Sequence, residues 1–240
     1  MSAAAKDVPT AKAAAPRLRD AATLILVERT GAQTRVLMGK RHAGLKFLPG
    51  KFVFPGGAVE AADRRMSVAG PLDPNVAAKL LEKTRHSSPD FARALALAAL
   101  RETFEETGLA LGVSDCGAPQ NPPEGVWARF AATGVYPSLD ALDFLARAIT
   151  PPGRPKRFDA RFFVADASLI AHRTPDVVHD EAELVELVWT PLDKAHELDI
   201  PLITRMVLGD LAIAARSGMD RLRKRPFYRQ VCGKAWRGEL

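Results

Sequence analysis

The sequence has few cysteines and no long apolar segment, and both absences narrow the class of protein that it encodes. Cys116 and Cys232 are its two cysteines, and they are far apart. Two distant cysteines supply neither a thiolate metal site nor a disulfide framework, so we expect a cytoplasmic location. No apolar run approaches the roughly 18–20 residues that a membrane-spanning helix needs. We therefore expect no membrane partner.

The central part of the chain also lacks an excess of basic charge, although the whole sequence has a formal net charge of +6. Residues 1–20 carry four basic and two acidic side chains, and residues 217–240 carry seven basic and two acidic ones. This leaves a net charge of −1 for residues 21–216. Because the basic charge sits at the ends, the folded domain has no electrostatic surface typical of nucleic-acid binding. We expect a disordered N-terminal tail over 1–20 and a solvated basic C-terminal tail over 217–240.

Strand-like and helix-like patterns alternate irregularly along residues 21–216. Apolar and β-branched runs predict strands, and apolar residues at helical spacing predict helices. The predicted strands are 21–28, 34–41, 142–149, 161–165 and 182–190, and the predicted helices are 75–85, 91–107 and 201–216. Residues 64–89 interrupt the pattern as an insertion. This order favours a mixed α/β domain over a doubly wound parallel sheet.

Three glutamates near the end of the second predicted helix are spaced to share one face. Glu102, Glu105 and Glu106 stand at i, i+3 and i+4, so their carboxylates project together. If they converge in a cleft, two charges ~4 Å apart repel by about 4 kcal/mol at an effective dielectric of ~20. A cation that prefers oxygen ligands, such as Mg²⁺, relieves this repulsion. Arg101 precedes Glu105 by one helical turn and could hold its carboxylate.

Glutamates with this spacing usually form a solvated helix face. Three neighbouring features favour a confined site instead. Residues 92–100 are almost entirely apolar, which predicts that the helix is buried, and Gly108 ends it abruptly. Upstream, Pro55-Gly56-Gly57 forms a sharply shaped loop whose backbone N–H groups could face the same place.

This segment resembles the second half of the nudix box, G-x5-E-x7-R-E-U-x-E-E-x-G-U, in which U is a bulky aliphatic residue. The matching residues are Arg101, Glu102, Glu105, Glu106, Gly108 and Leu109. Thr103 departs from the pattern at the first U. In the first half, Asp63 takes the place of the glutamate six positions after Gly57, and 38 positions separate it from Arg101 where the pattern has 8. Asp63 could orient Arg101 or reach a metal through water.

The resemblance implies a nudix-type α/β/α sandwich with a mixed sheet over residues 21–216, with an insertion at about 64–89. The long insertion inside the box, the phrase Phe54-Pro55-Gly56-Gly57 and the later phrases at 150–152 and 157–163 resemble the coenzyme A and acyl-coenzyme A diphosphatase branch.

The resemblance also implies a bound Mg²⁺ or Mn²⁺. Glu105 and Glu106 would be its principal ligands, and Glu102 a third ligand or the base that orients the attacking water, with Arg101 in support. Nudix enzymes often draw one more acid from a distant loop or strand. Three glutamates, Glu181, Glu183 and Glu186, are the local candidates, with Glu183 our first choice. For each of them, a solvated strand edge is the alternative interpretation.

Five further residues are candidates for substrate binding. Glycines at 56 and 57 would let the backbone approach a diphosphate closely, or they simply make a turn. An arginine at the end of a predicted strand could contact a phosphate. A basic loop could hold the 3′-phosphate of a coenzyme A nucleotide, or be solvated surface. The candidates are Arg41, Gly56, Gly57, Arg154 and Arg157, with Lys156 in the same basic loop.

The sequence therefore predicts an enzyme that hydrolyses the diphosphate linkage of coenzyme A or an acyl derivative, with a small-molecule nucleoside diphosphate derivative as its partner. One alternative is an enzyme acting on ADP-ribose, NADH, a dinucleoside polyphosphate or an oxidised nucleotide. A second is a nudix-fold sensor that binds such a ligand without turnover. A third, RNA processing through the basic tail, predicts binding that depends steeply on salt. The sequence gives no oligomeric state.

Overall fold

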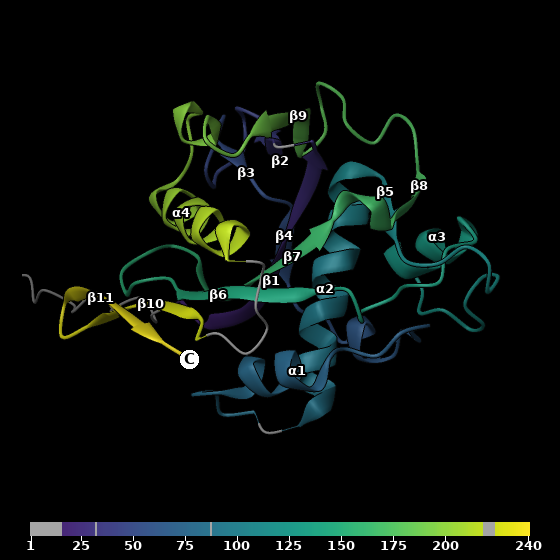
Figure 1. Ribbon diagram of the computed structural model, residues 1–240, viewed down its shortest axis with the longest axis horizontal. Helices are drawn as coiled ribbons and strands as arrows, with labels where there is room; N and C mark the ends of the chain where they lie inside the picture. Colours follow the sequence, from purple (N-terminus) through teal and green to yellow (C-terminus); the bar gives the residue numbers. More distant parts are fainter. Residues whose placement is uncertain (1–15, 32, 87, 218–223) are drawn as a thin grey trace, which may run out of the picture.

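The computed structural model describes residues 16–31, 33–86, 88–217 and 224–240. Its centre is a nine-stranded sheet, counted within these ranges, in the order β11-β10-β6-β7-β1-β2-β3, with β4 beside β1 and β9 beside β2 (Figure 1). β1 runs parallel to β7, whereas β6 runs antiparallel to β7. The sheet is therefore mixed, and the predicted mixed α/β fold is confirmed.

The elements of the fold have the following bounds. The strands are β1 (Leu18–Thr30), β2 (Gln33–Arg41), β3 (Phe52–Val53), β4 (Gly56–Ala58), β5 (Leu109–Leu111), β6 (Asp143–Ile149), β7 (Arg157–Asp166), β8 (Ile170–Arg173), β9 (Leu184–Pro191), β10 (Pro226–Val231) and β11 (Lys234–Glu239). The α-helices are α1 (Pro74–Leu81), α2 (Pro89–Thr107), α3 (Val126–Ala132) and α4 (Leu202–Arg216). Short 3₁₀ helices are η1 (Ala62–Arg64), η2 (Ala167–Leu169) and η3 (Ala195–Glu197). β5 and β8 form a separate two-stranded sheet that the sequence did not predict.

Helices cover both faces of the main sheet. Successive side chains of a strand point to opposite faces, so one strand contributes apolar residues to two cores. On β1, Leu24 and Leu26 belong to the core shared with α1, α2 and α3. Their neighbours Ile25 and Val27 belong to the core shared with α4. Figure 1 shows α2 and α4 on opposite sides of the sheet. The result is an α/β/α arrangement.

α2 is the helix that carries the three glutamates, and its ends follow from its sequence. Ser88 caps the N-terminus by accepting a hydrogen bond from the Asp90 N–H, and Pro89 occupies the first turn. Gly108 ends the helix in the left-handed conformation at φ 73°. A side chain there would also collide with the Thr174 carbonyl, since a Cβ would lie 2.4 Å from that oxygen. Nearly every residue from Phe91 to Leu100 is buried, as predicted.

The insertion at 64–89 forms part of the core. Met66, Val76 and Leu80 are buried in the same cluster as α2. Asp73 caps α1 by accepting hydrogen bonds from the N–H groups of residues 75 and 76. The predicted extension of this helix to residue 85 is wrong, because Glu82 is already extended at ψ 136°.

The predicted boundary of the N-terminal tail at residue 20 is also wrong. β1 begins at Leu18 and pairs in register with β7 from Arg157 onward. Asp20 accepts a hydrogen bond from the Arg161 Nη1 at 2.7 Å, so its charge is used inside the fold. Residues 1–15 lie outside the described residues.

The C-terminal segment is not a solvated tail, which corrects the second boundary. β10 and β11 form an antiparallel hairpin, and β10 pairs parallel with β6 at Phe227 and Tyr228, both buried. Arg225 is only 2% exposed, and its Nη2 lies 3.1 Å from the Asp143 carboxylate. The segment folds because its apolar residues extend the main sheet and because Arg225 forms an ion pair with the buried Asp143. Residues 218–223 of the predicted tail lie outside the described residues.

No helix in the described part of the chain is long and apolar enough to cross a membrane.

Two neighbouring basic residues test whether the C-terminal hairpin is integral to the fold. We expect Arg225→Ala to lower the free energy of unfolding by about 3–5 kcal/mol, because it leaves a buried carboxylate with a lost partner. Lys224→Ala should cost less than about 1 kcal/mol, since Lys224 is exposed and its ion pair with Glu239 is solvated. Urea unfolding measures both. Equal, small effects would mean that the hairpin contributes little to the fold.

Candidate active site

The carboxylates of α2 meet the glycine bend, in which Pro55 turns the chain and Gly56 and Gly57 begin β4, so these glycines are strand residues and not the predicted loop. The Gly56 N–H donates a hydrogen bond to Glu106 Oε2 at 3.1 Å. At Gly57, any Cβ would lie 2.3 Å from Glu102 Oε1, so a larger residue could not stay there without displacing this carboxylate. The glycines thus let the helix and the bend approach closely. This contact brings together four of the predicted site residues: Glu102, Glu106, Gly56 and Gly57.

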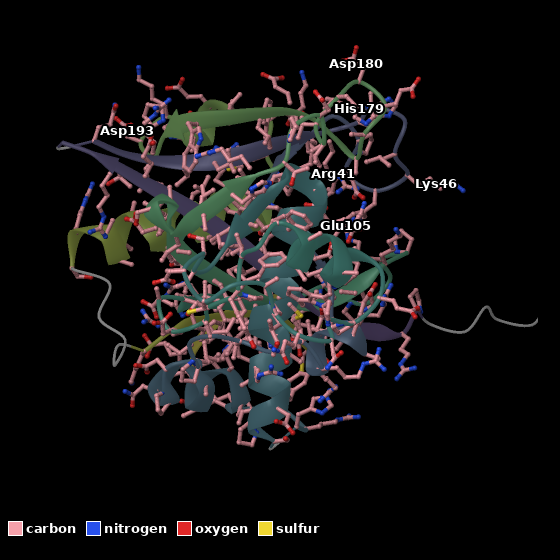
Figure 2. All side chains as sticks on the ribbon, turned by 90° about the vertical axis from the view of Figure 1, so that its right-hand side faces the viewer. Arg41, Lys46, Glu105, His179, Asp180 and Asp193 are labelled. Carbon is pink, nitrogen blue, oxygen red and sulfur yellow. The ribbon has the colours of Figure 1, made fainter. Side chains whose placement is uncertain are left out.

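Glu105 is placed differently from its two neighbours. Its side chain is 42% exposed, and its Oε2 lies 3.4 Å from Arg101 Nη1. In the view of Figure 2, Glu105 lies with Arg41 below the loop that carries His179 and Asp180. Among the residues that the structure describes, no three acidic, histidine or cysteine side chains are arranged ready to hold a metal ion. Glu105 would have to turn away from Arg101 to join the other two.

Two of these carboxyl groups are in surroundings that oppose their ionisation. Burial raises the pKa of Glu102 to about 7, with Glu105 and Asp63 adding to the rise and Arg101 opposing it. Burial also raises the pKa of Glu106 well above its usual value, and the charges of Glu183 and Glu102 add to this. Both carboxyl groups therefore favour the neutral form in the cation-free protein, and ionising them here costs free energy.

The chemistry of these residues fits a hard divalent cation. Carboxylate oxygens are the ligands that Mg²⁺ and Mn²⁺ prefer, and a cation beside Glu102 and Glu106 would favour the ionised forms that burial opposes. The Gly56 and Gly57 backbone lies directly beside these carboxylates.

Arg101 and Asp63 form a buried ion pair beneath the glutamates. Arg101 Nε donates to Asp63 Oδ1 at 2.7 Å and Arg101 Nη2 donates to Asp63 Oδ2 at 3.2 Å. Asp63 has no exposed surface and Arg101 is 2% exposed. Arg101 also reaches the Ala58 carbonyl at 2.8 Å and Glu102 Oε1 at 3.0 Å. The sequence left two roles open for Asp63, orienting Arg101 or reaching a metal through water. Its contacts support the first role.

Arg41 and Glu183, both candidates from the sequence, contact one another. Arg41 Nη1 lies 2.8 Å from Glu183 Oε1, while its Nε donates to the Phe47 carbonyl at 3.0 Å. A bulge between β2 and β9 pairs Arg41 with Leu184 rather than with the next residue in register. Bulges of this kind redirect side chains near functional sites. The charges of Glu183 and Arg41 both act on the pKa of Glu106, so the pair lies near that carboxylate.

The other two candidate acids lie outside this cluster. Glu186 pairs with Lys40 at 3.6 Å, and both side chains are more than 40% exposed. Glu181 is exposed, and its N–H donates to His179 Nδ1 at 3.3 Å. Geometry therefore favours Glu183 of the three.

The predicted basic loop approaches the loop that follows β2. The rings of Phe158 and Phe47 lie 6.1 Å apart edge to face, and Lys156 Nζ lies 5.9 Å from the Phe47 ring centre. Arg157 Nε donates to the Thr150 carbonyl at 3.3 Å, which closes the loop. Arg154 is exposed, and within the described chain no contact ties it to the glutamates.

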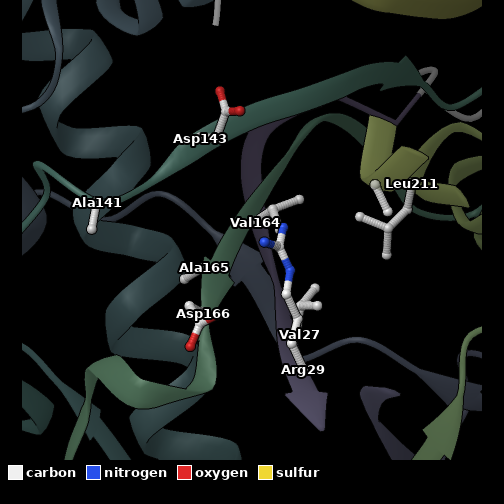
Figure 3. A pocket seen from close by; sticks show the side chains of 9 residues that line it. Val27, Arg29, Ala141, Asp143, Val164, Ala165, Asp166 and Leu211 are labelled. Atoms are coloured by element: carbon white, nitrogen blue, oxygen red, sulfur yellow. The ribbon is translucent and has the colours of Figure 1, made fainter. Parts of the chain in front are cut away.

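A separate hollow of about 160 Å³ lies away from the glutamates (Figure 3). It is lined by the ends of β1 and β7, by the start of β6 and by the C-terminal half of α4. The lining residues include Val27, Asp166 and Leu211. Val27 and Leu211 belong to the core on the α4 side, whereas α2 lies on the other face of the sheet. This hollow is therefore distinct from the carboxylate cluster.

Comparison with known proteins gives two informative relatives. No protein-family model matches the chain. The chain is 28% identical over 180 residues to a Caenorhabditis elegans protein named "Putative nudix hydrolase 7", and the match covers 71% of this chain and 50% of that protein. The chain thus spans about half the length of this curated relative. The crystal structure of a nudix hydrolase from Alicyclobacillus acidocaldarius superposes with a TM-score of 0.61 at 28% identity, covering 84% of this chain and 96% of that one.

Similarity in both sequence and structure supports the nudix hydrolase superfamily and is consistent with an enzyme. The mixed α/β fold with its mixed sheet matches the nudix hydrolase structure.

The raised pKa of Glu102 predicts a pH-dependent stability of the cation-free chain. Its folded-state pKa of about 7 lies above the ordinary value of 4.5, so between these pH values the folded state keeps a proton that the unfolded state has released. The free energy of unfolding should then fall as pH rises through this window, by on the order of 2–3 kcal/mol, and level off above it.

Glu102→Gln removes this titrating group and should make the fall smaller, while Glu106, whose pKa is also raised, still contributes. Urea unfolding at pH 5 and pH 7.5, with chelator present, compares the two proteins. Parallel pH profiles for wild type and variant would contradict the burial of a strained carboxylate at this position.

Proposed function

We propose that the chain is a Mg²⁺- or Mn²⁺-dependent hydrolase that cleaves the diphosphate linkage of coenzyme A or an acyl-coenzyme A. The observation that carries this proposal is the contact between the α2 carboxylates and the Gly56-Gly57 bend. The half-buried Glu102 and the buried Glu106, both with raised pKa values, lie directly against a backbone that has no side chains to hold them away.

Hydrolysis of a diphosphate requires that charge on the attacked phosphate be neutralised and that a water be made nucleophilic. A bound divalent cation supplies both by polarising the phosphoryl oxygen and lowering the pKa of water. Glu105 and Glu106 would hold the cation, and Glu102 would be a third ligand or would accept a proton from the attacking water. Glu183 would add a further carboxylate beside Glu106.

Arg41 is proposed to bind a phosphate of the substrate. Its side chain is 12% exposed and its Nε is held by the Phe47 carbonyl, so its position is already fixed before a ligand arrives. The present partner of Arg41 is Glu183. A guanidinium can form paired hydrogen bonds with phosphate as readily as with carboxylate, so an incoming diphosphate can compete for it.

The preference for coenzyme A rests on the basic loop. Arg154, Lys156 and Arg157 would receive the 3′-phosphate, which ADP-ribose and NADH lack. The contact of Lys156 and Phe158 with Phe47 supports this choice, because Phe47 also accepts the hydrogen bond of Arg41. We further propose that the protein acts in the cytoplasm, in keeping with its two exposed free cysteines, Cys116 and Cys232.

We expect Glu106→Gln to lower kcat about 100-fold or more while the protein stays folded, since a lost ligand weakens a cation that supplies several kcal/mol of transition-state stabilisation. Steady-state hydrolysis of coenzyme A with Mg²⁺ measures this. Glu186→Gln is the matched control, because Glu186 pairs with Lys40 outside the cluster. If the Glu106→Gln protein has near wild-type rates at low Mg²⁺, then Glu106 is not part of the metal site.

A substrate panel tests the coenzyme A assignment. With Mg²⁺, coenzyme A should be hydrolysed with a KM about tenfold lower than that of 3′-dephospho-coenzyme A, because charge-assisted hydrogen bonds contribute about 1.5–3 kcal/mol. Lys156→Ala should raise the KM for coenzyme A and leave that for the dephosphorylated compound unchanged.

The same panel includes ADP-ribose and NADH. If either is preferred over coenzyme A by tenfold, the coenzyme A assignment is wrong and the enzyme acts on another nucleoside diphosphate derivative. If the chain binds these compounds without hydrolysing any of them, it is a ligand sensor.

A further inference from the structure

The buried carboxylate of Asp63 is held by four hydrogen bonds. Oδ1 accepts from Arg101 Nε at 2.7 Å and from Trp127 Nε1 at 3.0 Å. Oδ2 accepts from Arg101 Nη2 at 3.2 Å and from the Glu60 N–H at 2.8 Å. A buried charge is stable only when its oxygens are satisfied in this way. The position of the carboxylate is therefore set jointly by Arg101, Trp127 and the backbone.

Trp127 comes from α3, which lies 64 residues beyond Asp63 in the sequence. Its side chain is completely buried, and the indole N–H is its single hydrogen-bond donor. That one polar atom is aimed at Asp63. Trp127 thus connects a helix outside the nudix-like motif to the acid within it.

α3 supports the same turn of α2 by a second, apolar contact. The Phe130 ring lies 5.1 Å from the Phe104 ring and 5.4 Å from the Trp127 ring. Phe104 stands between Glu102 and Glu105 on α2. The two aromatic residues of α3 therefore differ in a useful way, because both pack in the core that α2 shares and only Trp127 donates a hydrogen bond to Asp63.

The contacts of Arg101 extend this connection to the glutamates. Its Nη1 lies 3.0 Å from Glu102 Oε1 and 3.4 Å from Glu105 Oε2, on the same guanidinium that Asp63 holds. Because a guanidinium is planar and rigid, fixing Nε and Nη2 also fixes where Nη1 points. A shift of Asp63 would therefore move the Arg101 guanidinium and change its contacts with Glu102 and Glu105.

We propose that Trp127 is a positioning residue for the cation-binding glutamates, acting through Asp63 and Arg101. The inference rests on the proposed function, since it assigns Trp127 to that same site. Groups that orient metal ligands without touching the metal commonly change metal affinity 10–100-fold when they are removed. The alternative is a purely structural role, in which a buried indole N–H simply needs an acceptor.

Mn²⁺ binding to the full chain, followed by the loss of the free-ion electron paramagnetic resonance signal, separates these roles without relying on turnover. Trp127→Phe keeps an aromatic ring and removes the N–H, and we expect it to weaken Mn²⁺ binding about tenfold. Phe130→Leu is the matched control. It should lower the melting temperature as well, because it also removes packing against Phe104, and yet bind Mn²⁺ within twofold of wild type.

Equal Mn²⁺ affinity of Trp127→Phe and wild type would overturn the inference and leave the proposed function standing. Absence of Mn²⁺ binding by the wild-type chain would overturn the proposed function and this inference with it.

A second measurement uses the unaltered protein and holds even if Trp127→Phe does not fold. In ¹⁵N-labelled protein, addition of Mg²⁺ should shift the indole N–H signal of Trp127, because cation binding pulls Glu102 and Glu105 relative to Arg101. Trp236 on β11 packs against Phe227 at the far edge of the sheet, so its indole N–H signal should not shift. An unchanged Trp127 signal at Mg²⁺ saturation would contradict the inference.

Discussion

The arrangement of the site depends on one buried ion pair, that of Arg101 with Asp63. Breaking such a pair is strongly destabilising because it leaves an uncompensated charge in the interior. The pair joins Asp63 of η1, directly before the insertion, to Arg101 in the later turns of α2, which follow it. It therefore closes the two halves of the motif across the 38 positions that separate them, and the insertion can form its own part of the core without displacing the glutamates.

The glutamates themselves are held where their charges are unfavourable. α2 is buried along most of its length, so its final turns cannot rotate to move Glu102 and Glu106 into solvent. Gly108 ends the helix directly beyond them, and Gly57 allows Glu102 to approach the bend. The fold thus confines the carboxyl groups of Glu102 and Glu106. This confinement lowers the stability of the cation-free protein and prepares the site to bind a cation.

Local signals in the sequence predicted the elements that form this site, and they missed the contacts that complete it. The helix from Pro89 to Gly108 and the nearness of its glutamates to Gly56 followed from caps, periodicity and motif spacing. The sequence did not indicate Trp127, because no spacing rule relates a tryptophan to an acid 64 positions away. The C-terminal hairpin was missed for a similar reason. Its charged composition is typical of a tail, and its partners on β6 and at Asp143 are distant in the sequence.

We propose that α2 and the glycine bend enclose a divalent cation. A crystal soaked in Mn²⁺ would reveal such an ion through its anomalous scattering. We expect a peak coordinated by Glu102, Glu105 and Glu106 beside Gly56 and Gly57, with Glu105 turned away from Arg101. A saturated crystal in which Glu105 still contacts Arg101 and no peak lies between these carboxylates would contradict it.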